Sequence, residues 1–175
     1  MRLSRMLAVF AVVLLVLALS NSAQGQATAT PQEIVHKVHE AASSLAKAGA
    51  AKAGEASLTQ FNQKQSPWVW KDTYIFVLDC TANTMAAHPI KPELVGKDIS
   101  KMTDTKGTAF FGDLCAATKK PSGVWVEYWW PKPGEKEGSR KISYALRAEN
   151  TPYVVGAGTY DEKATIAELE KISAR

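Results

Sequence analysis

The segment "GVWVEYWWPKPG", residues 123–134, contains three of the five tryptophans of the 175-residue chain. Alternate side chains of a β-strand point to opposite faces of its sheet. As a strand, the segment would place these side chains on one face: Val124, Val126, Tyr128 and Trp130. The opposite face would carry Trp125, Glu127 and Trp129. The sequence therefore predicts a strand at about residues 123–130 with aromatic rings on both faces, followed by a turn.

The two faces of this strand allow different roles for the rings. The all-apolar set is the candidate core, but Tyr128 and Trp130 fit a pocket lining as well, because small-ligand sites are aromatic walls with few polar groups. Trp129 is expected to be a half-exposed edge residue or, alternatively, an anchor for a partner protein. The sequence leaves both alternatives open.

Patterns on either side of this strand predict an α+β fold. Runs of β-branched and aromatic side chains predict further strands at 73–79, 84–88, 139–148 and 153–159. "TPQE", residues 30–33, has a hydroxyl cap, a proline at the first helical position and a glutamate three residues after the cap, which is typical of a helix start. Gly49 and Gly54 are expected to break or kink the helix that follows. We expect a long N-terminal helix packed on an antiparallel sheet of about five strands.

Shorter helices are predicted within residues 108–120 and near the C-terminus, where Asp161 is a candidate cap. Residues 89–107 hold two prolines, two glycines and several charges, and we interpret them as a long ordered loop. Loops of this length in a compact domain are usually functional.

The first residues have the pattern of a secretory signal peptide. Arg2 and Arg5 precede an apolar run of 14 residues from Met6 to Leu19, and small residues follow it. The run is shorter than the roughly 20 residues that span a bilayer, so cleavage after Ser20 or Ala23 is favoured over an uncleaved anchor. We predict a signal peptide at 1–23, a flexible segment at 24–29, one domain at 30–161, and a C-terminal helix or tail at 162–175. The mature protein is expected to be periplasmic or secreted, with no transmembrane segment.

Charge and cysteine content restrict the partners. Removal of Arg2 and Arg5 lowers the formal net charge from +4 to +2, which argues against nucleic acid. The chain has two cysteines, Cys80 and Cys115, and an oxidising compartment would permit a disulfide between them without requiring one. Two cysteines are too few for a zinc site, and we predict no metal or other cofactor.

Several polar residues lie where they could serve a site. His88 could cap its strand or donate to an anionic ligand. Lys141 could be an exposed strand lysine or could neutralise a ligand carboxylate, and regular alternation would place it opposite Tyr144. His36 and His39 are interpreted as solvated helix residues. Nucleophile-elbow, zinc-protease and phosphate-loop motifs are missing from the sequence, so we predict that the protein is not an enzyme.

Five motifs in order resemble a known family. They are "YIFVLD", "AAHPIKPELVGKDI", "D-x-x-G-x-x-FF", "GVWVEYWWPKPG" and "RKISYALRAENTPYVVGAGTYD". Together they resemble the single Cache domain, the extracytoplasmic PAS-like sensor module of bacterial chemoreceptors and histidine kinases, from about residue 30 to residue 161. The resemblance implies a long N-terminal helix, a curved antiparallel sheet, and a pocket between sheet and loop for a small molecule, often a short carboxylate.

The resemblance also implies a set of ligand-binding residues. They are Tyr74, His88, Phe110, Tyr128, Lys141 and Tyr144, with Trp125 and Trp130 as aromatic walls. "DCTANTMAAHP" departs from the family's usual acidic-glycine turn, and a Cys80–Cys115 bond there would fasten the hairpin to the element that covers the pocket. Family members usually lie between transmembrane helices, which the mature chain is not expected to have.

These observations predict an extracytoplasmic small-molecule binding or sensing domain. It would act through a partner such as a membrane receptor or histidine kinase, or as a soluble binding protein. The alternative is an interaction module that has no ligand and docks through the tryptophan-rich strand.

Overall fold

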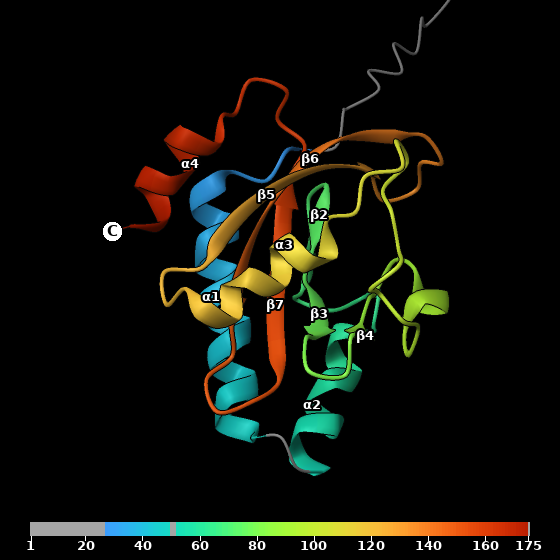
Figure 1. The fold of residues 1–175 in the computed structure, drawn as a ribbon, viewed down its shortest axis with the longest axis vertical. Helices are drawn as coiled ribbons and strands as arrows, with labels where there is room; N and C mark the ends of the chain where they lie inside the picture. Colours follow the sequence, from blue (N-terminus) through green and yellow to red (C-terminus); the bar gives the residue numbers. More distant parts are fainter. Residues whose placement is uncertain (1–26, 50–51, 175) are drawn as a thin grey trace, which may run out of the picture.

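A computed structural model describes residues 27–49 and 52–174, and the predicted signal peptide lies outside them. Five antiparallel strands form the main sheet in the order β4-β3-β7-β6-β5 (Figure 1). Their bounds are Phe76–Asp79 (β3), Thr84–Ala87 (β4), Val124–Pro131 (β5), Gly138–Arg147 (β6) and Tyr153–Thr159 (β7). A separate two-stranded ribbon joins β1 (Val69–Trp70) to β2 (Thr73–Tyr74). The predicted α+β fold with an N-terminal helix and five antiparallel strands is confirmed.

Helix α1 (Pro31–Ala48) begins as the sequence predicts. The Thr30 side chain accepts a hydrogen bond from the Glu33 backbone N–H, and the Glu33 carboxylate accepts one from Thr30, which forms a capping box. Gly49 ends the helix with a φ of 76°, a conformation that glycine adopts without a steric penalty. Gly54 does not end a helix, because it lies inside the next one, α2 (Lys52–Phe61).

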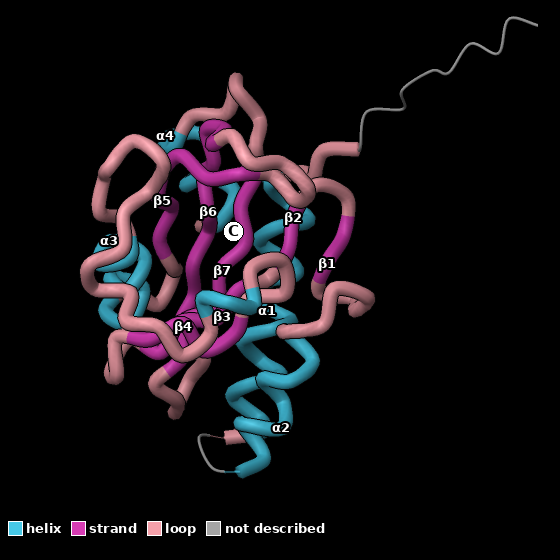
Figure 2. The backbone as a smooth tube through the Cα atoms, turned by 90° about the vertical axis from the view of Figure 1, so that its right-hand side faces the viewer, coloured by secondary structure: helices cyan, strands magenta, loops and turns pink. Residues whose placement is uncertain are grey.

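The sheet has two faces that are covered by different elements (Figures 1 and 2). The helix face packs against α1 and α4 (Ile166–Ser173), with Ile34, Val38 and Leu45 of α1 in its core. The loop face is covered by residues 89–119, which include the short helices η1 (Pro92–Leu94), α3 (Phe111–Cys115) and η2 (Ala116–Lys119). These names for the two faces are kept below.

The Cys80–Cys115 disulfide ties the end of β3 to α3. The sequence had left this bond open. Because α3 begins at Phe111, and Phe110 directly precedes it on the loop face, the bond fastens this part of the cover to the sheet.

Two local predictions were wrong. Thr165, not Asp161, caps the C-terminal helix, and its side chain accepts from the Glu168 backbone N–H. Ala29, assigned to a flexible segment, is buried, and its N–H donates to Asp72 Oδ1 at 2.8 Å. The Thr165–Glu168 contact is local and could have been found from the sequence, whereas Ala29 and Asp72 are 43 residues apart and meet only in the folded chain.

Candidate site on the loop face of the sheet

Lys141 is a fully buried lysine in the middle of β6. It lies directly across from Tyr128 in the β5–β6 register. Its Nζ lies 4.2 Å from the ring centroid of Tyr74 and 5.1 Å from that of Tyr160. Within the described part of the chain, Nζ has no hydrogen-bond partner. Burial lowers the pKa of Lys141 to about 7, because a charged amine is poorly solvated there, although the Asp72 charge opposes this effect.

Glycine in β7 makes room for the Lys141 side chain. Gly158 pairs with Ser143, the next loop-face residue after Lys141 along β6. A Cβ atom on Gly158 would lie 2.6 Å from Lys141 Cε, which is closer than atoms can pack. The "GAG" segment, residues 156–158, therefore permits close approach to β7, and the Phe76 ring packs in the same way beside Gly156.

Tyrosine side chains lie around the amine. Tyr128 Oη and Ser143 Oγ are hydrogen-bonded at 2.8 Å, and Tyr160 Oη donates to the Pro131 carbonyl at 2.9 Å. Burial raises the pKa of Tyr74, Tyr128 and Tyr160 well above the usual range. These phenols therefore stay protonated at neutral pH, and they offer hydroxyl groups rather than negative charge.

His88 adds a neutral imidazole from the end of β4. Its Nδ1 accepts the backbone N–H groups of Ile90 and Lys91 at 3.3 and 3.0 Å, so the proton of the neutral ring is on Nε2. Burial, together with the charges of Lys141 and Lys91, lowers the pKa of His88 to about 3. Its ring centroid lies 4.8 Å from that of Tyr74. His88 is thus a buried N–H donor beside the lysine.

Aromatic side chains from the covering segment close the cluster. Phe110 stacks on Tyr128 with ring centroids 3.9 Å apart and meets the edge of Trp130 at 5.7 Å. Lys91 lies over the outer part of the cluster, with Nζ 4.9 Å from the Trp130 ring centroid. Tyr74, His88 and Lys141 are each at most 2% exposed. The arrangement is a closely packed, buried cluster of aromatic rings with one amine and several polar hydrogens among them.

The structure brings together six of the eight residues that the resemblance implied. They are Tyr74, His88, Phe110, Tyr128, Trp130 and Lys141. The other two lie elsewhere: Trp125 and Tyr144 pack against each other on the helix face, with ring centroids 5.1 Å apart. Trp125 Nε1 donates to Ser173 Oγ of α4, and Tyr144 Oη donates to the Ser122 carbonyl. Grouping them with the other six was wrong, because alternation along β5 and β6 places their side chains on the opposite face of the sheet.

Sequence reasoning missed Phe76, Ser143, Gly158 and Tyr160. Alternation from Tyr74 would have found Phe76, and alternation from Lys141 would have found Ser143. Tyr160 could not be found in this way. Its position beside Lys141 follows from the β6–β7 register, in which Ile142 pairs with Thr159, and a single sequence does not give that register.

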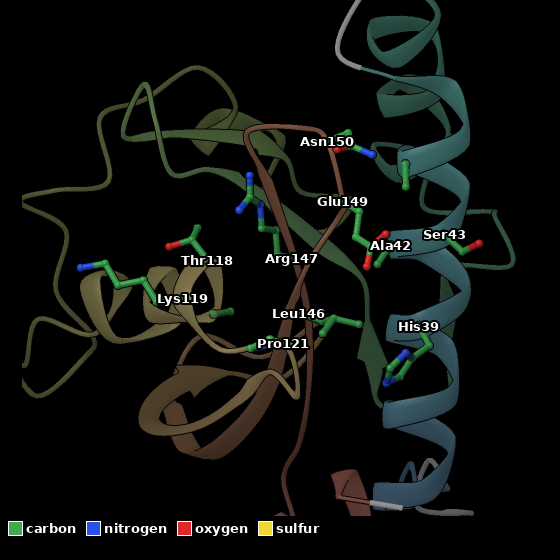
Figure 3. A pocket seen from close by; sticks show the side chains of 12 residues that line it. His39, Ala42, Ser43, Thr118, Lys119, Pro121, Leu146, Arg147, Glu149 and Asn150 are labelled. Atoms are coloured by element: carbon green, nitrogen blue, oxygen red, sulfur yellow. The ribbon is translucent and has the colours of Figure 1, made fainter.

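A separate groove lies at the end of the molecule where η2 and the β6–β7 turn approach α1 (Figure 3). It has a volume of about 580 Å³, and its lining includes His39, Lys119, Leu146, Arg147 and Asn150. None of its lining residues belongs to the Lys141 cluster. For the described residues, no group of three histidine, cysteine or acidic side chains could hold a metal ion.

Comparison with known proteins agrees with the fold. Residues 33–165 match the Cache domain family. The chain belongs to the Cache domain family. A stretch of 89 residues, 51% of this chain, is 33% identical to the methyl-accepting chemotaxis protein McpP of Pseudomonas putida, and 90 residues are 31% identical to the sensor histidine kinase MctS of Rhizobium johnstonii. These matches span only 16% and 19% of the two relatives.

Solved Cache structures have the same architecture. One, described as the structural basis for carboxylic acid recognition by a Cache chemosensory domain, superposes with a TM-score of 0.61 at 29% identity, over 75% of this chain and 92% of that one. Another, a periplasmic sensor domain of a chemotaxis protein, gives a TM-score of 0.60 at 28% identity, over 73% and 93%. Helices able to cross a bilayer are absent from residues 27–49 and 52–174.

Proposed function

We propose that this Cache domain binds a short organic carboxylate on its loop face, with Lys141 as the counter-ion. The observation that carries the proposal is the buried Lys141 amine, which has no partner among the described residues and is enclosed by aromatic rings. An isolated charge is costly to bury, and a carboxylate would remove that cost by forming a charge-assisted hydrogen bond.

The other members of the cluster have complementary roles in this proposal. The Nε2–H of His88 and the hydroxyl of Tyr74 are donors that a carboxylate can accept. Phe110 and Trp130 would bury the apolar end of the ligand. The enclosure favours a ligand of a few carbon atoms over a large one, because the side chains already pack closely.

The ligand must gain access to a closed cluster. The covering segment includes residues 89–110, most of which are exposed, with Ile99 and Phe110 as its deeply buried apolar anchors. Segments with few buried apolar contacts open at low free energy. We therefore expect access by a local outward movement of this segment, and closure over the ligand would change the surface that a partner meets.

The comparisons support a sensing role with a carboxylic acid ligand. The similar proteins are a chemotaxis receptor and a sensor kinase, and one similar structure concerns carboxylic acid recognition. We propose that the exported protein presents its bound state to a membrane receptor or histidine kinase, or acts as a soluble binding protein. N-terminal sequencing of protein recovered outside the cytoplasm would test the export and the cleavage at residues 20–23.

Docking through the tryptophan-rich strand has less support than ligand binding. Trp125 is buried under α4, so it cannot be part of an exposed anchor pair. Trp129 is half-buried, and Lys106 Nζ lies 3.2 Å from its ring centroid. The backbone of Trp129 is bonded to Asp104 and Thr105 of the loop, which cover this part of the β5 edge.

Calorimetric titration with acetate and propionate, and with acetamide and propionamide as uncharged controls, tests the proposal. We expect binding of an acid and none of its amide, together with a raised melting temperature that increases with ligand concentration. Lys141→Met should abolish binding, whereas Lys136→Met, in the exposed β5–β6 turn, should leave it unchanged. Equal binding by the Lys141→Met protein, or no response to any short carboxylate in a broad panel, would refute the assignment.

Gly158→Ala gives a second test that keeps the Lys141 amine and changes its position. The added methyl group would lie 2.4 Å from Ser143 Oγ, 2.6 Å from Lys141 Cε and 2.9 Å from Lys141 Cγ, so both side chains would have to shift. We expect at least a tenfold loss of affinity while the protein stays folded.

A further inference from the structure

Lys141 is placed so that its protonation would depend on the ligand. In the described structure its amine faces three aromatic rings, and no carboxylate forms a salt bridge with it. Asp72 is the acidic residue whose charge reaches Lys141, but its Oδ1 accepts the Ala29 N–H. A bound carboxylate would therefore be the direct ionic partner of a group that otherwise has none.

We propose that Lys141 takes up a proton when a carboxylate binds, so that the site responds to the ligand and to pH together. This inference rests on the proposed function. In the free protein the buried amine is disfavoured as a cation, because neither water nor an acid solvates it. With the carboxylate in contact, the cation is the favoured form.

The other titratable groups that face Lys141 do not change charge near neutral pH. His88, from β4, has a pKa lowered to about 3 and stays neutral, in agreement with its two accepted backbone hydrogen bonds. Tyr74 from β2, Tyr128 from β5 and Tyr160 after β7 have raised pKa values and stay protonated. Lys91 lies farther out, over Trp130. His36 and His39 are on α1, across the sheet.

The sign of the pH dependence follows from linkage. The pKa of Lys141 is about 7 in the free protein and would be higher in the complex. Affinity is then at its maximum below about pH 7 and falls as the pH rises from the free-state pKa toward the bound-state pKa. The loss approaches about tenfold for each pH unit above 7. Short carboxylates stay ionised over this range, so their own titration does not contribute.

Calorimetry of propionate binding at pH 6, 7, 8 and 9 measures this dependence. At pH 8, repetition in buffers with different ionisation enthalpies gives the number of protons taken up, which we expect to be close to one. Lys141→Arg is the matched variant: guanidinium stays charged at all these pH values, so any residual binding should be independent of pH and take up no proton. An NMR titration of the Lys141 Cε signal in the ligand-free protein should show a midpoint near 7.

The outcomes separate this inference from the proposed function. If wild-type protein binds propionate with constant affinity from pH 6 to pH 9 and without proton uptake, the proton coupling is wrong and the binding site stands. A Cε midpoint near the ordinary lysine value of about 10.4 would also overturn the coupling. If no carboxylate binds at any pH, both proposals fail.

Discussion

The two faces of the sheet bury side chains of different chemistry. The helix face is filled by apolar side chains of α1 and the strands, including the packed rings of Trp125 and Tyr144. The loop face buries Lys141, His88 and Ser143 among its aromatic rings, and the lysine amine has no partner within the described residues. A buried amine without a partner lowers the stability of a fold. We interpret the helix face as the part that stabilises the domain and the loop face as the part kept ready for a ligand.

The disulfide should contribute both to the stability of the fold and to the closure of the site, so its removal should have the broadest effect. Cys80→Ser together with Cys115→Ser opens a loop of 35 residues, and we expect a loss of about 3–4 kcal/mol in the free energy of unfolding. Because the bond also holds α3 and the adjoining Phe110 on the sheet, carboxylate affinity should fall in the protein that remains folded. Urea unfolding and calorimetry measure the two effects. Unchanged affinity would show that the bond stabilises the fold without positioning the cover of the site.

Truncation on the helix face should change stability alone. Leu45 of α1 is fully buried, and Leu45→Ala should lower the free energy of unfolding by about 2–5 kcal/mol through lost apolar contact and a cavity. Because the residue lies across the sheet from Lys141, the dissociation constant for a carboxylate should stay within about twofold, since distant sites act independently. A large loss of affinity at temperatures where the variant is folded would mean that the two faces are coupled.

The sequence predicted the elements better than the site. Local signals were sufficient for the α1 cap, for the five strands and for the two faces of residues 124–130, because caps and alternation involve neighbouring residues. The separation of Lys141 from Tyr144 also follows from alternation, yet the resemblance grouped them. Tyr160 could not be placed beside Lys141, because its position depends on the register between β6 and β7. Asp72 could not be placed either, because it lies in a turn about 70 residues before Lys141 in the sequence. For Lys141 itself the sequence allowed either an exposed strand lysine or a counter-ion in a site, because its burial depends on which segment covers the strand.

The contrast between the faces is sharpest at Lys141. Lys141→Met keeps a long flexible side chain and removes the amine that has no partner, so the free energy of unfolding at pH 7 should rise by about 1–3 kcal/mol while carboxylate binding is lost. The gain should grow as the pH is lowered from about 10 to 7 and level off below 7, because over that range the unfolded wild-type chain holds a proton on Lys141 that the folded protein does not. Chemical unfolding at these pH values, with Lys136→Met as the control, measures the change. A destabilised Lys141→Met protein would show that the amine supports the fold, and our distinction between the faces would then be wrong.

The smallest expected effect is at the exposed start of α1. Glu33 accepts from Lys71 Nζ at 2.6 Å, and this bond together with the Thr30 cap lowers the pKa of Glu33 to about 2. Since the folded-state pKa lies below the unfolded value, the stabilisation is present above about pH 4.5 and is lost as the pH falls toward 2. The side chains are 41% and 32% exposed, so solvent screening limits the contribution to less than about 1 kcal/mol. Glu33→Gln keeps the cap and removes the charge; it should be slightly less stable than wild type at pH 7 and equal to it near pH 2. Because the Lys141 amine faces the rings of Tyr74, Phe76 and Tyr160, carboxylate affinity should be unaffected by Glu33→Gln. A change in affinity would indicate that the α1 terminus and the adjoining Asp72 segment move together with the site.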